Sequence, residues 1–209
     1  LTTAQVKAIA SDTIAALSSR QVGALSATQV GALTAGQIAA IETGDIAGLA
    51  TATVAALSSV QVGALSTGQV AAFASAQVAA VGISSLAGLG ADDMAALTTA
   101  QVKALTAVQF GAMTSAQVAA LTTDQVQALT TAQVAALGTR TVRSLSTVQV
   151  AALTTAQAKA LGGLQAAALT SGQVAAIGTA SLGALSTGAI AGLSTVGIQA
   201  LTTEQVSQL

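Results

Sequence analysis

An apolar residue recurs at every eighth position of the chain, from Leu1 to Leu209, without an insertion or a deletion. We label the eight positions a to h from this residue, so that the commonest unit reads Leu-Thr-Thr-Ala-Gln-Val-Ala-Ala, as at residues 129–136. Position f is also apolar in every unit, as at Val6. Uninterrupted repetition of this kind indicates an array in which each unit is one structural element. The sequence therefore predicts a single continuous array over residues 1–209.

The eight-residue spacing favours short helices. A continuous helix would need 4.0 residues per turn to keep positions a on one face, whereas an α-helix has about 3.6. Strands are disfavoured as well, because the apolar positions alternate by five and three instead of two, and because alanine is abundant where β-branched residues would be expected. We expect the helix to end and begin again in each unit.

A start signal for these helices is present at positions b and e. The two positions read Ser/Thr-x-x-Gln, the spacing of a capping box, as in Thr2 with Gln5. Of 17 units with Ser or Thr at b, 15 carry Gln at e, but only two of the nine other units do, at Gln77 and Gln165. This coupling indicates reciprocal hydrogen bonds at each helix start.

Glycine and charged residues agree with the same phase. Where b is glycine, as at Gly90, position e changes to Asp, Ser or Thr in most cases, and glycine is an acceptable N-cap. Carboxylates lie in the cap or first turn, as at Asp12 and Glu204, and several cations lie near the helix end, as at Lys7 and Lys103. Helix dipoles favour this placement.

The units must stack because no single unit is stable alone. Each helix would run from about c to the next a, which is two turns, and isolated helices this short are marginal. We therefore predict an all-α solenoid of about 26 short capped helices, one per unit. A helical wheel places d, f, h and the next a on the packed arc, with c and g outward. On this arrangement Leu164 at d would compensate for the small Ala166 at f.

The composition of the chain excludes most kinds of catalytic and metal-binding site. The 209 residues include no His, Cys, Trp, Tyr or Pro, and 6% of them are charged. The net charge of −1 and the absence of a basic run exclude a nucleic-acid footprint. The two aromatics, Phe73 and Phe110, cannot form a stacking platform for bases, and Met94 and Met113 occupy f and a and are expected in the core. We expect no enzyme activity, no catalytic residue, no cofactor and no metal site.

A transmembrane segment is not expected either. The mean hydropathy is +0.76, but Ser, Thr or Gln interrupts each apolar run well before the roughly 18 residues that span a bilayer. The chain begins with Leu1 and both ends fall on the same phase of the repeat. We expect it to be a piece of a longer chain.

Two local features resemble functional sites. Asp92 and Asp93 are the one adjacent pair of carboxylates, and Gly88 and Gly90 lie in a Leu-Gly-Leu-Gly-Ala-Asp segment. The segment lacks the lysine of a phosphate loop and the oxygen series of a calcium loop. Helix-start charges and capping glycines account for both features.

Paired hydroxyls at b and c form a regular series along the chain. Thr98-Thr99 and Thr122-Thr123 are examples. A periodic row of hydroxyls on a solenoid surface would suit binding to a glycan, a protein or ice. Capping explains the b member without any binding function.

The motif Leu-Thr-Thr-Ala-Gln-Val-Ala-Ala-Leu, which occurs around Leu97, Leu121, Leu129 and Leu153, resembles the tandem-repeat tracts of very large bacterial secreted or surface-attached proteins, often described as adhesins or haem-utilisation proteins. The resemblance implies an extracellular or cell-surface location. It extends over the whole chain. Haem binding finds no support, because no His, Tyr or Cys is present to ligate iron.

Together these features predict a structural repeat segment of a bacterial cell-surface or extracellular protein, such as an adhesin stalk, a matrix component or a filament. The alternative is a binding module that uses the hydroxyl series. Self-association along the array is also expected, because a solenoid without polar terminal repeats exposes apolar end faces. A cell-surface or glycan partner fits both hypotheses.

Overall fold

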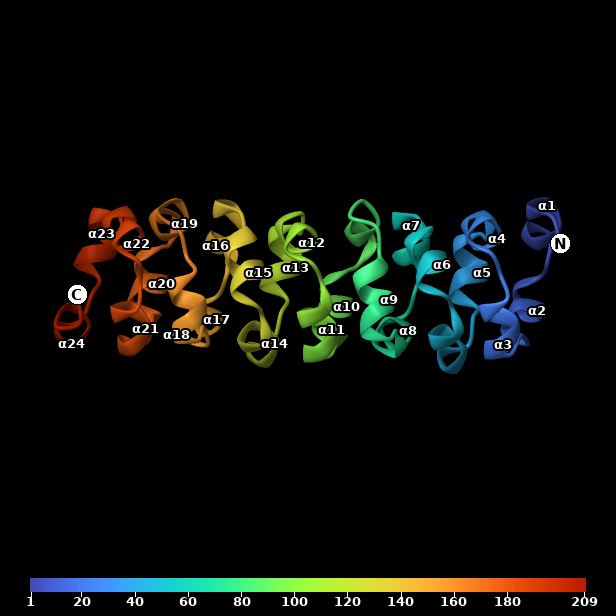
Figure 1. Ribbon diagram of the computed structural model, residues 1–209, viewed down its shortest axis with the longest axis horizontal. Helices are drawn as coiled ribbons and strands as arrows, with labels where there is room; N and C mark the ends of the chain where they lie inside the picture. Colours follow the sequence, from blue (N-terminus) through green and yellow to red (C-terminus); the bar gives the residue numbers. More distant parts are fainter. The chain divides into compact units, whose positions relative to one another are not determined.

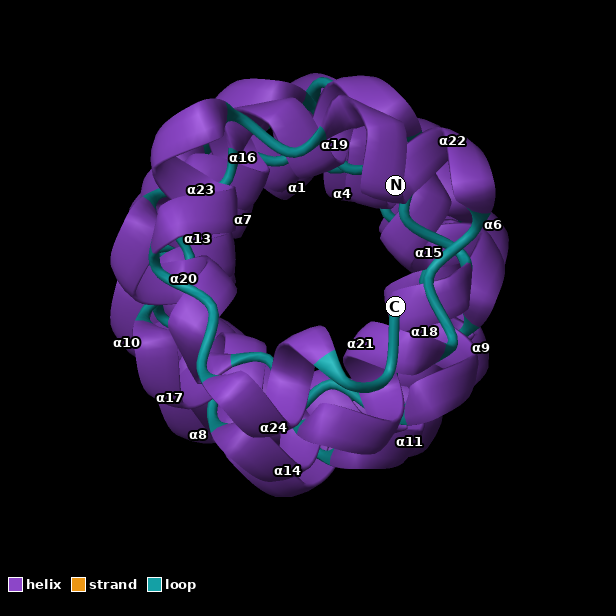
Figure 2. Ribbon diagram, turned by 90° about the vertical axis from the view of Figure 1, so that its left-hand side faces the viewer, coloured by secondary structure: helices purple, strands orange, loops and turns teal.

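The computed structural model describes all 209 residues and contains 24 α-helices and two short 3-10 helices. Helices and loops are its only elements, with no strand (Figure 2). One helix forms in each eight-residue unit, as the sequence predicts, and the helices follow one another along the chain in Figure 1. The all-α prediction with one helix per unit is confirmed.

Contact clustering divides the chain into two compact units, Leu1–Leu105 and Thr106–Leu209. The elements of the first are α1 Thr3–Lys7, α2 Ser11–Ala15, α3 Ser19–Gly23, α4 Ala27–Ala32, α5 Ala35–Ala39, η1 Thr43–Gly48, α6 Thr51–Ala55, α7 Ser59–Val62, α8 Thr67–Ala72, α9 Ser75–Ala80, η2 Ser85–Gly88, α10 Ala91–Ala96 and α11 Thr99–Ala104. Those of the second are α12 Ala107–Gly111, α13 Ser115–Ala119, α14 Thr123–Ala128, α15 Thr131–Ala136, α16 Thr139–Ser144, α17 Thr147–Ala151, α18 Thr155–Lys159, α19 Gly163–Ala168, α20 Ser171–Ala176, α21 Thr179–Gly183, α22 Thr187–Gly192, α23 Thr195–Gln199 and α24 Thr203–Val206.

All 24 α-helices begin at position c, directly after the predicted cap, whereas the 3-10 helix η2 begins two residues later, at Ser85. In α11 the N–H of Gln101 donates to Thr98 Oγ1 at 3.2 Å, and the N–H of Thr98 donates to Gln101 Oε1 at 2.7 Å. The same two bonds recur in most units of both halves of the chain. Position b has extended backbone, with φ −69° and ψ 157° at Thr98. The predicted capping box is therefore present, but α2 and α6 follow Ala10 and Ala50 without a side-chain cap and begin at the same position of the repeat.

The helices end one to three residues earlier than expected. They stop at f, g or h, and the following a residue leaves the helix, as at Leu105 with φ −59° and ψ 138°. The N–H of Leu105 still bonds to the carbonyl of Val102 at 3.3 Å, which closes the last turn. Extended backbone at a directs the chain to the next cap, so position a cannot remain helical.

Within each of the two compact halves, Leu1–Leu105 and Thr106–Leu209, the main contacts join each helix to the helix three places along the chain. In the first unit α1 packs on α4 and α6 on α9, and in the second α12 packs on α15 and α19 on α22. Both units are therefore solenoids in which successive coils stack, as predicted.

Positions a and f form the core. Val102 and Leu105 are buried, as are Met94, Phe110 and most of the other large apolar residues at these positions. The wheel was wrong about position d, which faces solvent, as at Val108 and Val148. Position e is buried in its place, because the helix is too short to follow an ideal wheel and because its two ends are fixed by the cap and by the extended a residue.

The predicted compensation between Leu164 and Ala166 is also wrong. Leu164 is 79% exposed while Ala166 is fully buried. Their side chains leave α19 in different directions, since d points outward and f points inward. The small residue at f is therefore not filled by the large one at d.

Candidate functional site

The glutamine at position e links successive coils. Gln37 accepts a hydrogen bond from the N–H of Thr34 through Oε1 at 2.8 Å, which completes the cap of its own helix. Its Nε2 donates to the carbonyls of Ile9 at 2.7 Å and Val6 at 3.1 Å, both at the end of α1. One amide thus caps the start of α5 and the end of α1, and its side chain is 2% exposed.

The same arrangement recurs in the second unit. Gln173 Nε2 donates to the carbonyls of Leu145 at 2.7 Å and Val142 at 3.0 Å, while its Oε1 accepts from the N–H of Thr170 at 2.8 Å. We call this double cap the glutamine clamp. Further clamps that bond to the preceding coil are formed by Gln61, Gln69, Gln77, Gln101, Gln149, Gln157, Gln165 and Gln205.

The clamp sets how many repeats separate one coil from the coil that it bonds to. Each amide reaches the a carbonyl 28 residues earlier, which is three and a half repeats of eight. Since the last carbonyls of a helix lack partners within the helix, the clamp satisfies groups that would otherwise be buried without a hydrogen bond. Each bond of this kind contributes about 1 kcal/mol to stability.

Hydroxyl side chains replace the amide in some units. Ser85 Oγ donates to the carbonyl of Leu57 at 2.6 Å, again 28 residues earlier. Thr53 and Ser181 make the corresponding bonds, at 3.4 Å and 3.3 Å. In these three units position e therefore supplies a hydrogen-bond donor to the preceding coil without glutamine.

The candidate residues singled out in the sequence take structural positions. Asp93 is buried and its Oδ2 accepts from the N–H of Gly90 at 2.9 Å, so it caps α10, whereas Asp92 is exposed. Met94 and Met113 are buried in the core. The acidic residues nowhere gather in a group of three or more that could hold a metal ion.

The two hydroxyls of each pair have different surroundings. Thr154 at b accepts the N–H of Gln157 at 3.3 Å and is part of the cap. Thr155 at c is exposed, as are Thr99 and Thr131. The c hydroxyls of Thr99, Thr131 and Thr155 are therefore exposed and take no part in the caps.

The repeat motif of this chain matches a known repeat family. The ALTTAQ repeat family matches residues 1–35, 38–75, 86–123, 104–139, 126–163 and 174–209. The chain belongs to the ALTTAQ repeat family. Comparison with curated proteins gave no match.

The longest stretches of this ALTTAQ repeat chain outside the family matches are residues 76–85 and 164–173. The first includes Gly82 and Ser85, whose unit forms the 3-10 helix η2 in place of an α-helix. The second includes Leu164 and Ala166, which depart from the commonest residues at d and f.

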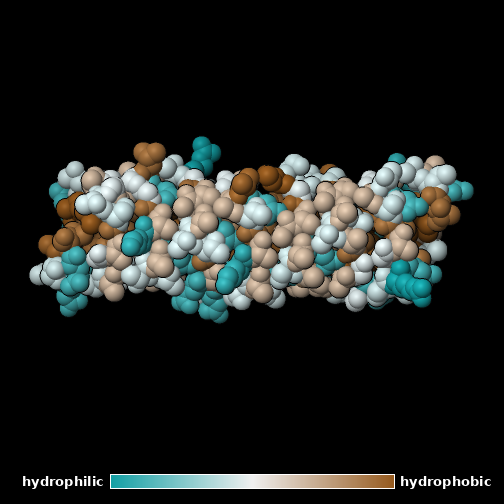
Figure 3. Space-filling view, viewed as in Figure 1, coloured by the Kyte–Doolittle hydropathy of each residue, from teal (hydrophilic) through white to brown (hydrophobic).

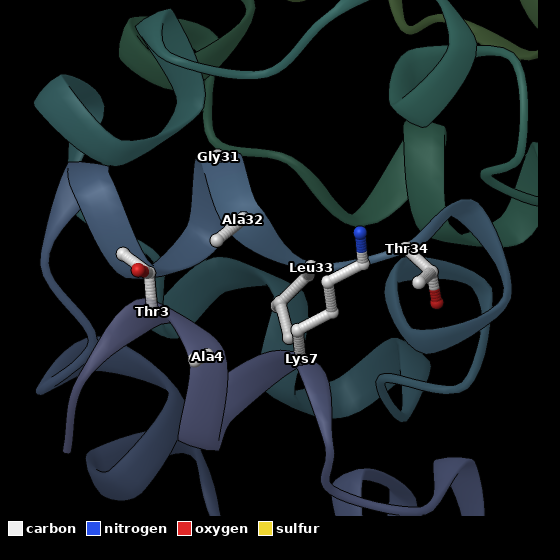
Figure 4. Close-up of a pocket in the computed structure, with 7 residues that line it drawn as sticks. All are labelled: Thr3, Ala4, Lys7, Gly31, Ala32, Leu33 and Thr34. Atoms are coloured by element: carbon white, nitrogen blue, oxygen red, sulfur yellow. The ribbon is translucent and has the colours of Figure 1, made fainter.

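Small pockets occur between successive coils of the ALTTAQ repeats. Figure 4 shows one of about 420 Å³, where the Lys7 side chain runs beside Leu33 and carries its ammonium toward Thr34. A second pocket beside Arg143 lies at the same place in the repeat, since Lys7 and Arg143 are both at g. Both are open and lined by small apolar and hydroxyl side chains, with no convergent set of polar groups.

The outer surface carries few charges. The face in Figure 3 shows mostly side chains of intermediate hydropathy, with scattered hydrophilic ones. Isolated apolar residues at position d, including Val60, Val108 and Leu164, are exposed. None of the helices is both long and apolar enough to cross a membrane.

Proposed function

We propose that this chain is a structural spacer segment of a bacterial cell-surface or extracellular protein, such as an adhesin stalk, a matrix component or a filament, and that it has no enzymatic activity. The observation that carries the proposal is the glutamine clamp. It joins each coil to the one before it through buried bonds such as Gln37 to Ile9 and Gln173 to Leu145. Such a module can be lengthened by adding repeats.

The side chains support a mechanical role over a chemical one. The polar groups with the most specific geometry, the e glutamines, are buried and bonded to backbone carbonyls. Nucleophilic catalysis needs a base beside the nucleophile, and no histidine is present to act with the many serine hydroxyls. The resemblance to tracts of large secreted and surface-attached proteins gives the proposed location.

Localisation of the full-length product tests the proposal. Cells that carry or lack the gene would be labelled with antibodies to the repeat and imaged, with surface proteolysis as a second readout. We expect labelling at the surface or in the extracellular matrix, lost in the deletion strain. An exclusively cytosolic product would contradict the proposed location and role.

A binding module is the second candidate, and the exposed hydroxyls at c favour it. Thr131 and Thr155 are not used by the caps and recur at a regular spacing. Substitution of both by Val should abolish binding to a glycan array or to ice while the far-ultraviolet circular dichroism stays unchanged. Ala132→Val with Ala156→Val, at the neighbouring exposed d positions, is the matched control because it adds apolar bulk without removing a hydroxyl.

A further inference from the structure

The pockets beside Lys7 and Arg143 are two copies of one arrangement, one in each compact half of the chain. Their volumes are similar, about 420 Å³ and about 370 Å³. Lys7 and Arg143 are 136 residues apart, which is seventeen repeats of eight. In Figure 4 the ammonium of Lys7 lies on the side of the pocket where Thr34 is found, and Thr170 is the equivalent residue beside Arg143.

The residues that follow each cation agree as well. In both copies position d holds glycine 29 residues after the cation and valine 53 residues after it, namely Gly36 and Val60 in the first and Gly172 and Val196 in the second. Lys103 lies at g between the two copies and has alanine at both places. A Cβ atom at Gly36 would meet nothing within 4 Å, and Val196 is 61% exposed. Packing between coils therefore requires neither residue, and the shared pattern concerns the outer surface.

The charge around these pockets is positive. No carboxylate is among the residues that line either pocket. In the second half no acidic residue lies between Asp124 and Glu204 in the sequence, whereas three cations do. Arg143 is one of these cations, and its side chain is exposed. A surface of one sign without counter-charges attracts ligands of the opposite sign.

The pocket beside Arg143 combines three kinds of group. Arg143 supplies a guanidinium, Ser171 an exposed hydroxyl at c, and Val196 an exposed apolar side chain. A guanidinium binds carboxylates and sulfates, and a hydroxyl both donates and accepts hydrogen bonds. No aromatic side chain lines the pocket to stack on a nucleic-acid base. A sugar ring with an acidic substituent presents the matching groups, because it carries an anion, hydroxyls and apolar C–H bonds.

We propose that each of these two pockets binds an acidic sugar unit of an anionic polysaccharide, with the carboxylate or sulfate of the sugar on the cation at g. The polar groups do not converge on one point, so one pocket alone binds weakly. A polymer with many acidic units gains affinity through several such contacts at once. The proposal adds a binding role to the scaffold role and rests on its extracellular location. A cytosolic full-length product would contradict the location alone, whereas a purified chain that fails to bind would overturn the pockets alone.

Surface plasmon resonance with the purified 209-residue chain tests the proposal. Polygalacturonate, dextran sulfate, neutral dextran and polyglutamate would be immobilised, and binding measured at about 0.15 M salt, where long-range attraction is screened. We expect binding to polygalacturonate, dextran sulfate or both, and none to dextran. Polyglutamate carries carboxylates without sugar rings and should bind more weakly. Failure to bind either acidic polysaccharide, or equal binding to dextran or polyglutamate, would overturn the proposal.

Removal of the two cations separates the pockets from net charge. Lys7→Gln with Arg143→Gln should lower the affinity about twentyfold, from about fivefold at each exposed site. Lys103→Gln with Arg140→Gln is the matched control, because it changes the net charge equally at exposed positions that line neither pocket. The control should keep most of the wild-type affinity. Equal losses in the two double variants would mean that charge alone attracts the polymer.

A carboxylate placed inside the second pocket gives an independent test. Ser171→Asp puts an anion beside Arg143 and should weaken binding as much as Arg143→Gln does. Thr155→Asp adds the same charge at an exposed c position outside the pocket and should bind as the wild type does. Asp suits the first turn of a helix, so far-ultraviolet circular dichroism should be unchanged in both variants. If Ser171→Asp also bound as the wild type does, the ligand would not enter this pocket and the proposal would be wrong.

Discussion

The choice of glutamine over glutamate at position e is the most informative feature at the residue scale. A capping box accepts either residue at this position, and the helix dipole favours the acid. No unit of this chain has glutamate there. The structure supplies the reason, since Gln173 needs an acceptor for the N–H of Thr170 and a donor for the carbonyl of Leu145. Of the two residues, only glutamine provides both.

Gln173→Glu should therefore lower the free energy of unfolding by about 3 kcal/mol, because it buries a carboxylate against two carbonyl oxygens. The same substitution at the exposed Gln21 keeps the cap of Ser18 and should change stability by less than about 0.5 kcal/mol. Urea unfolding followed by circular dichroism measures both. Equal costs at the two sites would show that the amide donors add nothing to stability.

The hydroxyls at positions b and c should also differ in how much they contribute to stability. Thr154→Ala removes the acceptor for the N–H of Gln157 and should cost about 1 kcal/mol, the usual value of an N-cap. Thr155→Ala removes an exposed hydroxyl at c and should stay within about 0.5 kcal/mol of the wild type. The thermal midpoints of the two variants compare them directly, and a larger loss at Thr155 would contradict the assigned caps.

At the scale of the helix, the sequence was a good guide to where each element begins and a poorer one to which faces it buries. The pairing of Ser or Thr at b with Gln at e placed the starts, because both partners of a local hydrogen bond lie four residues apart or less. The outward direction of d and the burial of e could not be read from a wheel, because they depend on a carbonyl 28 residues away. Leu164 shows the consequence, since it is large, apolar and exposed.

Helix packing also depends on how closely two backbones approach. A Cβ atom at Gly192 would overlap the carbonyl oxygen and backbone carbons of Gly163, whereas one at Gly188 in the same helix would meet nothing within 4 Å. Gly192→Ala should therefore cost about 2 kcal/mol through forced separation of α19 and α22. Gly188→Ala should instead raise stability by about 0.5 to 1 kcal/mol through helix propensity.

Unfolding midpoints in urea measure this pair of variants. The comparison is internal, because both substitutions add one methyl group to the same short helix. Similar effects at the two positions would mean that the backbones of α19 and α22 can move apart without loss, and the close approach would then have no energetic role.

At the scale of the whole chain, stability comes from a pattern that repeats and not from any one contact. Each eight-residue repeat has a backbone carbonyl at a, and most repeats have a hydrogen-bond donor at e. A repeat can therefore pack against any other repeat that lies at the correct spacing, because the positions of these groups are the same in each. The family matches over most of the chain reflect the same pattern. Each repeat protein of this type is stabilised by its units and by the interfaces between neighbours.

Removal of whole repeats should for this reason be tolerated. Deletion of residues 129–136 takes away the partner of Gln157, whose amide bonds to the carbonyl of Leu129 at 2.8 Å. After the deletion the residue 28 positions earlier is Leu121, which again offers an a carbonyl. We expect helicity per residue to be unchanged and the thermal midpoint to fall by about 2 °C to 4 °C, the equivalent of about 1 kcal/mol in a chain of this length.

Deletion of half a repeat is the matched control. Loss of residues 133–136 removes fewer atoms but also removes Gln133 and Val134, and it joins Ala132 directly to Leu137. The joined segment then has neither an e donor nor an f side chain at the spacing that the neighbouring coils require. Its midpoint should fall several times further than that of the eight-residue deletion. If the two deletions were equally harmful, individual contacts would determine stability, and the phase of the repeat would lose its place as the organising rule of the fold.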